Sequence, residues 1–118
     1  MNKELIISST LKELGVPADL KGYFYLKRAI KLIMQDNSLM FLITKRLYPI
    51  LAEQFETTPS RVERAIRHAI DVCWNRGSHA EHYNLFGYTV SENSGKPTNS
   101  NFINTISDYL IMTLQEGE

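Results

Sequence analysis

The chain has no excess of charge of either sign, because 13 lysines and arginines balance 13 aspartates and glutamates. No global basic field therefore points to a nucleic-acid partner, and evidence for one must come from local charge. The single cysteine, Cys73, excludes an intramolecular disulfide and fits a reducing compartment. No hydrophobic stretch approaches the roughly 20 apolar residues that cross a bilayer, and the N-terminus lacks the core and cleavage site of a signal peptide. We therefore expect a cytoplasmic protein without a membrane partner.

The motifs of common enzyme classes are also lacking. There is no glycine-rich phosphate loop and no arrangement of paired carboxylates. Cys73 falls on the apolar side of its predicted helix, where a thiol is usually inert. His79 and His82 could place two imidazoles on one helix face, but no convincing third metal ligand lies near them in the sequence. We expect exposed histidines there, and no metal, cofactor or enzyme activity.

Helical periodicity dominates what is present. At 118 residues and 43% hydrophobic composition, the chain is long enough for one domain with one core. The apolar spacing predicts helices over about 3–14, 20–35, 39–47, 49–55, 59–76 and 78–86, and a last one after the cap at 98–100, with Phe102, Ile103, Ile106, Tyr109 and Leu110 as its inner face. The long loop runs from Tyr88 to Pro97, and only Tyr88 to Val90 could form a short strand. We expect an all-α single domain spanning residues 1–118.

The segment from Pro49 to Ile70 has the layout of a helix-turn-helix. A short helix is followed by the turn Glu56-Thr57-Thr58 and by a second helix that begins at Pro59 and continues to Arg76. Ala52 is small enough for the two helices to cross there, and the apolar residues at the crossing are Leu51, Phe55, Val62, Ala65 and Ile66. Glu56 occupies the turn position that is often glycine, so the turn must be slightly strained or follow another backbone path.

The helix from Pro59 to Arg76 divides into two arcs when its residues are placed 100° apart. One arc is apolar, and the other is polar: Ser60, Arg61, Glu63, Arg64, Arg67, His68, Asp71 and Asn75. Arginine can form two hydrogen bonds to guanine, and glutamate can accept one from cytosine. The start of the helix also favours phosphate through its free amides and its dipole. This pattern predicts a helix that enters the major groove of DNA.

Three alternatives remain beside that interpretation. The polar arc could be a solvated surface with an internal Glu63–Arg67 pair, the chain could be a helical protein-interaction module without DNA affinity, or it could be a small enzyme. Trp74, the one large apolar residue on the polar arc, could stack on a sugar or base. We expect it instead to pack against the segment that follows.

Several uncommon strings add a resemblance over nearly the whole chain. Ser60 to Ile70 (SRVERAIRHAI) closely resembles the recognition helix of the stage-zero sporulation protein A family, the master response regulators of bacterial endospore formation. Six further strings resemble the effector domain of the same family: Gly15-Val16-Pro17-Ala18, Lys21-Gly22-Tyr23, Ile43-Thr44-Lys45, Leu47-Tyr48-Pro49, Leu85 to Ser91 and Lys96 to Ser100. The resemblance implies a compact six-helix domain that binds direct-repeat promoter boxes and activates or represses transcription.

The resemblance also implies roles and partners. Glu63, Arg64 and Arg67 would read bases, while Ser60, Arg61 and His68 would hold phosphates. Gly77 to Val90 matches the stretch that touches the RNA polymerase sigma subunit, with Phe86 and Val90 matching directly and Gly77 as a further contact residue. Residues 79–84 depart from the family pattern. A phosphorylatable receiver domain precedes the effector domain in that family and drives dimerisation. None is present here, so we expect part of a longer regulator that forms weak homodimers on tandem sites, associated with the bacterial nucleoid.

Lys96 belongs to the loop before the last helix. Its ammonium could meet a DNA phosphate, or it could be a solvated lysine. We include it among the candidate phosphate-binding residues.

Overall fold

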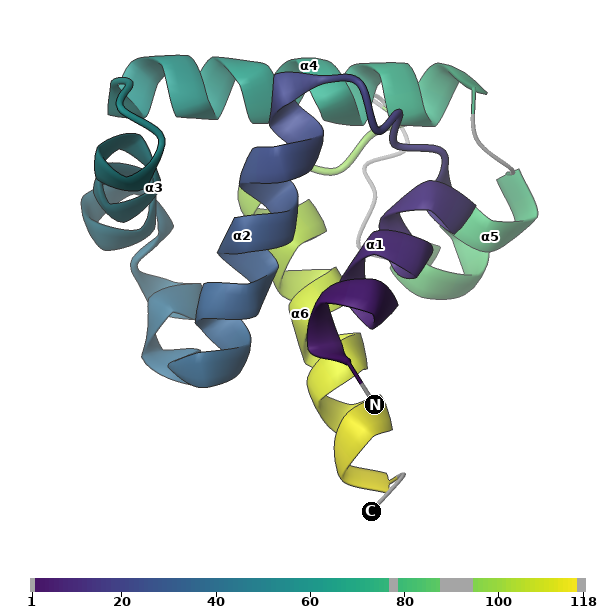
Figure 1. Cartoon of the computed structure of the whole chain (residues 1–118). Coiled ribbons are helices and arrows are strands. Elements are labelled where there is room, and N and C mark those ends of the chain that lie inside the picture. The colour runs from purple at the N-terminus through teal and green to yellow at the C-terminus, as the bar shows by residue number, and fades with distance from the viewer. Residues whose placement is uncertain (1, 77–78, 88–94, 117–118) are drawn as a thin grey trace.

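The computed structural model describes residues 2–76, 79–87 and 95–116. Within these ranges the chain is all-α and has no strand, as the sequence predicts (Figure 1). The possible strand at Tyr88 to Val90 lies outside the described residues. The elements are α1 (Lys3–Leu14), α2 (Lys21–Gln35), η1 (Asn37–Phe41), η2 (Ile43–Leu47), α3 (Tyr48–Gln54), α4 (Pro59–Arg76), α5 (His79–Phe86) and α6 (Asn99–Glu116).

Local hydrogen bonds explain where several helices begin and end. The Asn2 side chain accepts from the Glu4 amide at 2.8 Å and starts α1, which ends at Gly15 in the left-handed conformation (φ 100°). Thr98 starts α6 in the same way, because its hydroxyl accepts from the Asn101 amide at 3.1 Å. Such caps satisfy amides and carbonyls that have no partner inside the helix.

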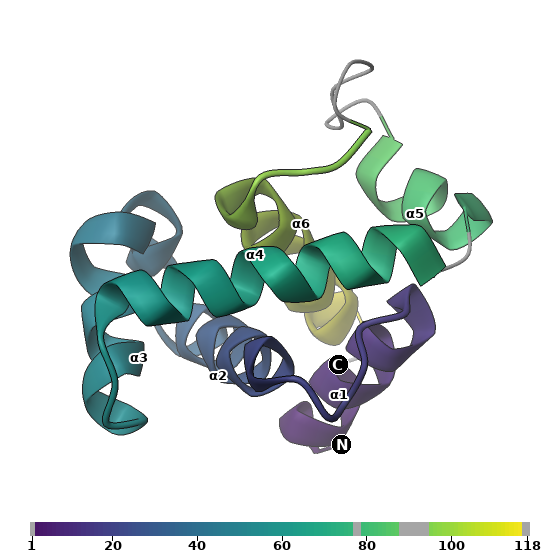
Figure 2. The ribbon, with the colours of Figure 1, turned by 90° about the horizontal axis from the view of Figure 1, so that it is seen from above.

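Helix α4 lies across one side of the molecule, and the other helices pack beneath it. Figures 1 and 2 show α2 and α6 crossing below α4, with α3 near the start of α4 and with α1 and α5 near its end. The buried side chains form one core, to which α4 contributes Val62, Ile66, Ala69, Ile70 and Cys73. The first turn of α1 and the last turn of α6 lie away from α4 (Figure 1). One long face of α4 is therefore left open to solvent.

The region before α3 differs from the single helix expected over residues 39–47. It consists of the 3₁₀ helix η1 and the π-helical turn η2, separated at Leu42, whose backbone (φ −131°, ψ 40°) is not helical. The wide turn of η2 directly precedes Pro49, which lies in the first turn of α3. Proline donates no amide and its ring crowds the carbonyl four residues earlier, so a wider turn before it relieves that crowding.

The inner face predicted for α6 is correct with one exception. Phe102, Ile103, Ile106 and Leu110 are buried, whereas Tyr109 is 48% exposed. The second half of α6 extends beyond the other helices (Figure 1), so fewer neighbours cover it. None of the described helices is both long and apolar enough to cross a membrane.

Candidate DNA-binding surface

The turn between α3 and α4 carries the strain that its sequence implies. Glu56 has φ 54°, which makes it the only residue other than glycine with a positive φ in the described part of the chain. The Thr57 amide donates to the Ala52 carbonyl at 2.8 Å, and this bond closes the turn over the end of α3. A left-handed backbone costs a residue with a Cβ roughly 1–2 kcal/mol, so the surrounding packing must hold it.

The apolar residues predicted at the helix crossing lie where the helix-turn-helix needs them. Leu51 and Ala52 of α3 are buried, as are Val62 and Ile66 of α4. Phe55 is partly buried and contacts the Tyr25 ring edge-on, with centroids 5.0 Å apart. Helix α3 is thus held against both α4 and α2, which fixes the direction in which α4 presents its open face.

The start of α4 is capped by Thr58. Its hydroxyl accepts from the Arg61 amide at 3.2 Å, and its carbonyl accepts from the Val62 amide at 3.0 Å. Pro59, as the first helical residue, has no amide to satisfy. Ser60 and Arg61 follow, both exposed, at the positive end of the helix dipole.

Helix α4 lies on the outside of the molecule (Figure 2), and its open face carries most of the residues predicted to contact DNA. Ser60, Arg61, Arg64, Arg67 and His68 are all exposed. Glu63 is partly exposed, and its carboxylate forms an ion pair with the Arg67 guanidinium at 2.9 Å, one helical turn away. Exposed pairs of this kind are worth about 0.3–0.5 kcal/mol, so a duplex could separate the two groups at little cost.

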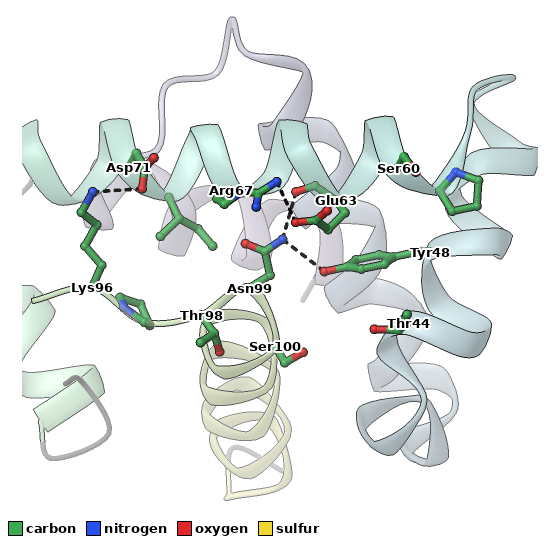
Figure 3. Close-up of a pocket in the computed structure, with 13 residues that line it drawn as sticks. Thr44, Tyr48, Ser60, Glu63, Arg67, Asp71, Lys96, Thr98, Asn99 and Ser100 are labelled. Atoms are coloured by element: carbon green, nitrogen blue, oxygen red, sulfur yellow. Dashed lines mark hydrogen bonds and ion pairs between the residues drawn. The ribbon is translucent and has the colours of Figure 1, made fainter. Parts of the chain in front are cut away.

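A groove of about 750 Å³ runs beside α4, between it, η2 and the start of α6 (Figure 3). Arg67 and Lys96 both line it, together with hydroxyls of Thr44, Ser60 and Ser100. Lys96 forms an ion pair with Asp71 of α4 at 3.2 Å. The loop before α6 is therefore joined to the polar arc of α4, and its lysine lines the same groove as Arg67.

Asn99 joins three elements at this groove, and sequence analysis missed it. Its side-chain amide donates to the Tyr48 hydroxyl of α3 at 3.1 Å and to the Glu63 backbone carbonyl of α4 at 3.0 Å (Figure 3). Burial raises the pKa of Tyr48, which favours its neutral hydroxyl. The sequence marked Asn99 only as part of a helix cap, because no local pattern reveals partners 51 and 36 residues away.

The family model of the sporulation initiation factor Spo0A C terminal matches residues 7–110. The chain belongs to this family. It is therefore the effector domain of a sporulation response regulator, a DNA-binding class of transcription factor domain and not an enzyme. The match includes all of α4 and the groove beside it.

His79 and His82 were both expected on the surface of this Spo0A-family domain, but His82 is not. His82 is buried at 3% exposure, and its Nε2 lies 2.8 Å from the Leu14 carbonyl, to which it donates. Folding places it 3.7 Å from the Cys73 thiol, although the two are in different helices. The expectation of an exposed His82 was wrong because the apolar face of α5 packs on α1 and α4. The side chain of His79 lies outside what the structure describes.

Trp74 packs as predicted against the segment that follows α4. Its ring stacks on His82, with centroids 4.1 Å apart and planes 10° apart, and it meets Phe86 edge-on at 5.3 Å. Cys73 beside it is fully buried, and burial raises the pKa of its thiol to about 12. The described residues contain no group of three or more His, Cys, Asp or Glu side chains that could hold a metal ion.

Of the three residues matched to polymerase contact, the structure describes one. Phe86 is 1% exposed and stacks on Phe102 of α6, so its side chain does not face a partner in this structure. It is instead part of the core that holds α5 in place. Gly77 and Val90 lie outside the described residues.

Proposed function

We propose that this domain recognises a specific promoter sequence by inserting α4 into the major groove of double-stranded DNA. The observation that carries the proposal is the division of α4 into a buried apolar side and an open side that bears three exposed arginines. A recognition helix needs this division, because its inner side must be fixed while its outer side enters the groove.

Within that surface, Glu63, Arg64 and Arg67 are proposed to read bases. Each arginine can donate two hydrogen bonds to the O6 and N7 of a guanine, and Glu63 can accept from the N4 of a cytosine. The Glu63–Arg67 pair holds both side chains on the open side before DNA arrives. Guanine and cytosine in neighbouring base pairs would satisfy both groups at once.

The proposed phosphate contacts surround these three residues. Ser60 and Arg61 lie at the start of α4, where the positive end of the helix dipole favours an anion. His68 is exposed further along α4, and Lys96 lies across the groove beside Asp71. Such contacts fix the position of the protein on the duplex without reading its sequence.

The regulatory roles are proposed from family membership. The domain would activate or repress promoters, and the stretch from Gly77 to Val90 would contact the sigma subunit of RNA polymerase. In a full-length regulator a phosphorylated receiver domain would control it, and two copies would form a weak homodimer on tandem direct-repeat sites. The place of action would be the nucleoid in the bacterial cytoplasm.

Selection from a pool of random duplexes with this chain tests the proposal. A DNA-reading domain enriches one short sequence, whereas a protein-interaction module enriches none. On the enriched duplex, Arg67→Ala should cost about 1–3 kcal/mol and blur the sequence preference. His68→Ala should weaken enriched and scrambled duplexes alike.

Lys3→Ala is the matched control, because it removes one exposed cation from α1, away from α4. It should leave both affinities nearly unchanged. Equal losses from Arg67→Ala and His68→Ala on every duplex would contradict the division of roles between them.

A further inference from the structure

Helix α4 has a second groove beside it, on the side away from the loop that carries Lys96. This groove has a volume of about 590 Å³ and opens between α4, the start of α2 and the turn after α3. Its lining residues include Lys21 of α2, together with Arg61 and Ala65 of α4. Figure 2 shows the start of α2 on one side of α4 and the loop before α6 on the other. A groove therefore borders α4 on each side.

The two edges of the open face of α4 line different grooves. Arg61 and Ala65 line the groove beside α2. Glu63 and Arg67 line the groove beside α6. When the residues of α4 are placed 100° apart, Arg64 falls midway between these two pairs. Arg64 thus marks the centre of the open face, with one groove on each flank.

The groove beside α2 carries more positive than negative charge. Lys21 and Arg61 are both exposed, and neither side chain forms an ion pair with any residue that the structure describes. Glu56, which is also exposed, is the one carboxylate among the described residues that line this groove. On the other flank, by contrast, Lys96 is paired with Asp71. The cations beside α2 are therefore available to an anion that binds from outside.

Lys21 is held close to α4 by the residue that follows it. The backbone of Gly22 packs against Ala65 and Ala69 of α4, so closely that an added Cβ would overlap the Ala65 carbonyl oxygen. Lys21 therefore lies where α2 meets α4. It is the cation of α2 that shares a groove with α4, since the other cations of α2 follow further along the helix.

A DNA duplex offers anions on both flanks of an inserted helix. The major groove is about 12 Å wide and a helix with its side chains about 10–12 Å across, so the phosphates of one strand follow each side of the helix. We propose that Lys21 and Arg61 bind phosphates of the strand beside α2, while Lys96 binds the opposite strand. This inference rests on the proposed DNA-binding function and adds α2 as a second helix that touches the duplex.

Contacts on both strands would position α4 in the groove. A cation on one flank alone would let the helix tilt toward that strand, whereas cations on both flanks hold it between the two. Phosphate contacts fix position and orientation but read no base, so the contribution of Lys21 should be independent of sequence. This property separates Lys21 from the proposed base readers.

Lys21→Ala tests the contact on the duplex selected above and on a scrambled one. It should weaken binding to both by the same factor, and the slope of log affinity against log salt should become shallower by about 0.9, as expected for one lost phosphate contact. Lys21→Arg keeps the cation and should restore the slope. Lys3→Ala, which removes an exposed cation of α1, should change neither quantity. A Lys21→Ala variant with unchanged affinity and slope overturns the proposal.

Neutral methylphosphonate linkages, substituted one at a time along each strand of the selected duplex, assign the contacts to strands. A linkage that weakens binding of the unaltered chain should lose its effect when the residue that contacts it is removed. The linkages that become silent in Lys21→Ala and Arg61→Ala should lie on one strand, and those in Lys96→Ala on the other. If Lys21 and Lys96 map to the same strand, the proposal is wrong.

The two proposals fail in different ways. If the unaltered chain binds no duplex, the proposed DNA-binding function is rejected and this inference with it. If the unaltered chain selects a sequence and Lys21→Ala binds as tightly at every salt concentration, only the inference about α2 is rejected.

Discussion

A Cβ added to Gly22 would overlap the backbone carbonyl oxygen of Ala65 and lie 2.7 Å from the Cβ of Ala69. Helices α2 and α4 are in direct backbone contact at this point. Gly22 lies inside α2 and has an ordinary helical conformation, so its backbone angles do not require glycine. Glycine is required because α4 packs directly against its backbone. This close approach helps to set the depth at which α4 lies on the molecule.

Gly22→Ala is expected to destabilise the domain by about 1–3 kcal/mol, because a backbone carbonyl cannot rotate away from the added methyl group. Helix propensity alone predicts the opposite sign, a gain of about 1 kcal/mol. Chemical denaturation measures the free energy of unfolding and decides between them. The exposed neighbour Lys21 supplies the control, since Lys21→Ala should change stability by less than about 0.5 kcal/mol. A Gly22→Ala variant more stable than the unaltered chain would contradict the close contact.

Glu56→Gly should stabilise the domain by about 1 kcal/mol, because glycine adopts the positive φ of the turn without steric cost. The same substitution at Glu53, which is exposed in α3, should cost about 1 kcal/mol through lost helix propensity. Thermal unfolding of both variants gives the comparison. If Glu56→Gly destabilised the domain, the Glu56 side chain would have to stabilise the turn through contacts that outweigh its backbone strain.

Asn99→Ala should cost about 1–3 kcal/mol, since it removes the amide that joins α6 to Tyr48 and Glu63. It should also weaken DNA binding, because the groove side of α4 loses its support. Tyr48→Phe removes only one of the two bonds and should cost less. Ser100→Ala, next in the chain and exposed, is the control. If Asn99→Ala and Ser100→Ala gave equal unfolding free energies, the role assigned to Asn99 would be wrong.

Cys73 predicts a loss of stability at alkaline pH. Its pKa is raised to about 12 in the folded chain from an ordinary value of 9.0, so the unfolded thiol loses its proton first as the pH rises. The stabilisation is complete below pH 9 and is lost as the pH rises toward 12. Cys73→Ala should therefore flatten the fall in the free energy of unfolding between pH 9 and 12, compared with the unaltered chain. If the free energy of unfolding fell equally with pH in both proteins, the thiol would contribute nothing to the loss of stability at alkaline pH.

The parts of the fold that depend on neighbours in sequence could be predicted. The end of α1 at Gly15, the start of α4 at Pro59 and the two arcs of α4 all follow from hydrogen bonds and apolar spacing within one or two turns. The unusual backbone of Glu56 was expected for the same reason, because a short turn leaves few conformations. The candidate DNA-binding residues were found in this way, and they are exposed except for Glu63 and Lys96, which are partly so.

Contacts between distant segments could not be predicted by the same reasoning. Four features depend on how the helices pack across the core: the burial of His82 beside Cys73, the inward position of Phe86, the pairing of Lys96 with Asp71 and the exposure of Tyr109. The change from one helix to η1 and η2 also escaped the periodicity, because helical turns of different width place apolar residues at similar spacing over so few residues.

By itself, then, the sequence of this chain determined that it forms helices, where most of them begin and end, and which side of α4 carries arginine. Those properties arise from backbone hydrogen bonds and from the 3.6-residue period, both of which act over short distances along the chain. Only the tertiary structure decided how α4 is held, through Gly22 beneath it and Asn99 beside it, and which apolar side chains remain outside the core. Those outcomes require close packing among segments far apart in sequence, because each helix can bury only the surface that another helix covers.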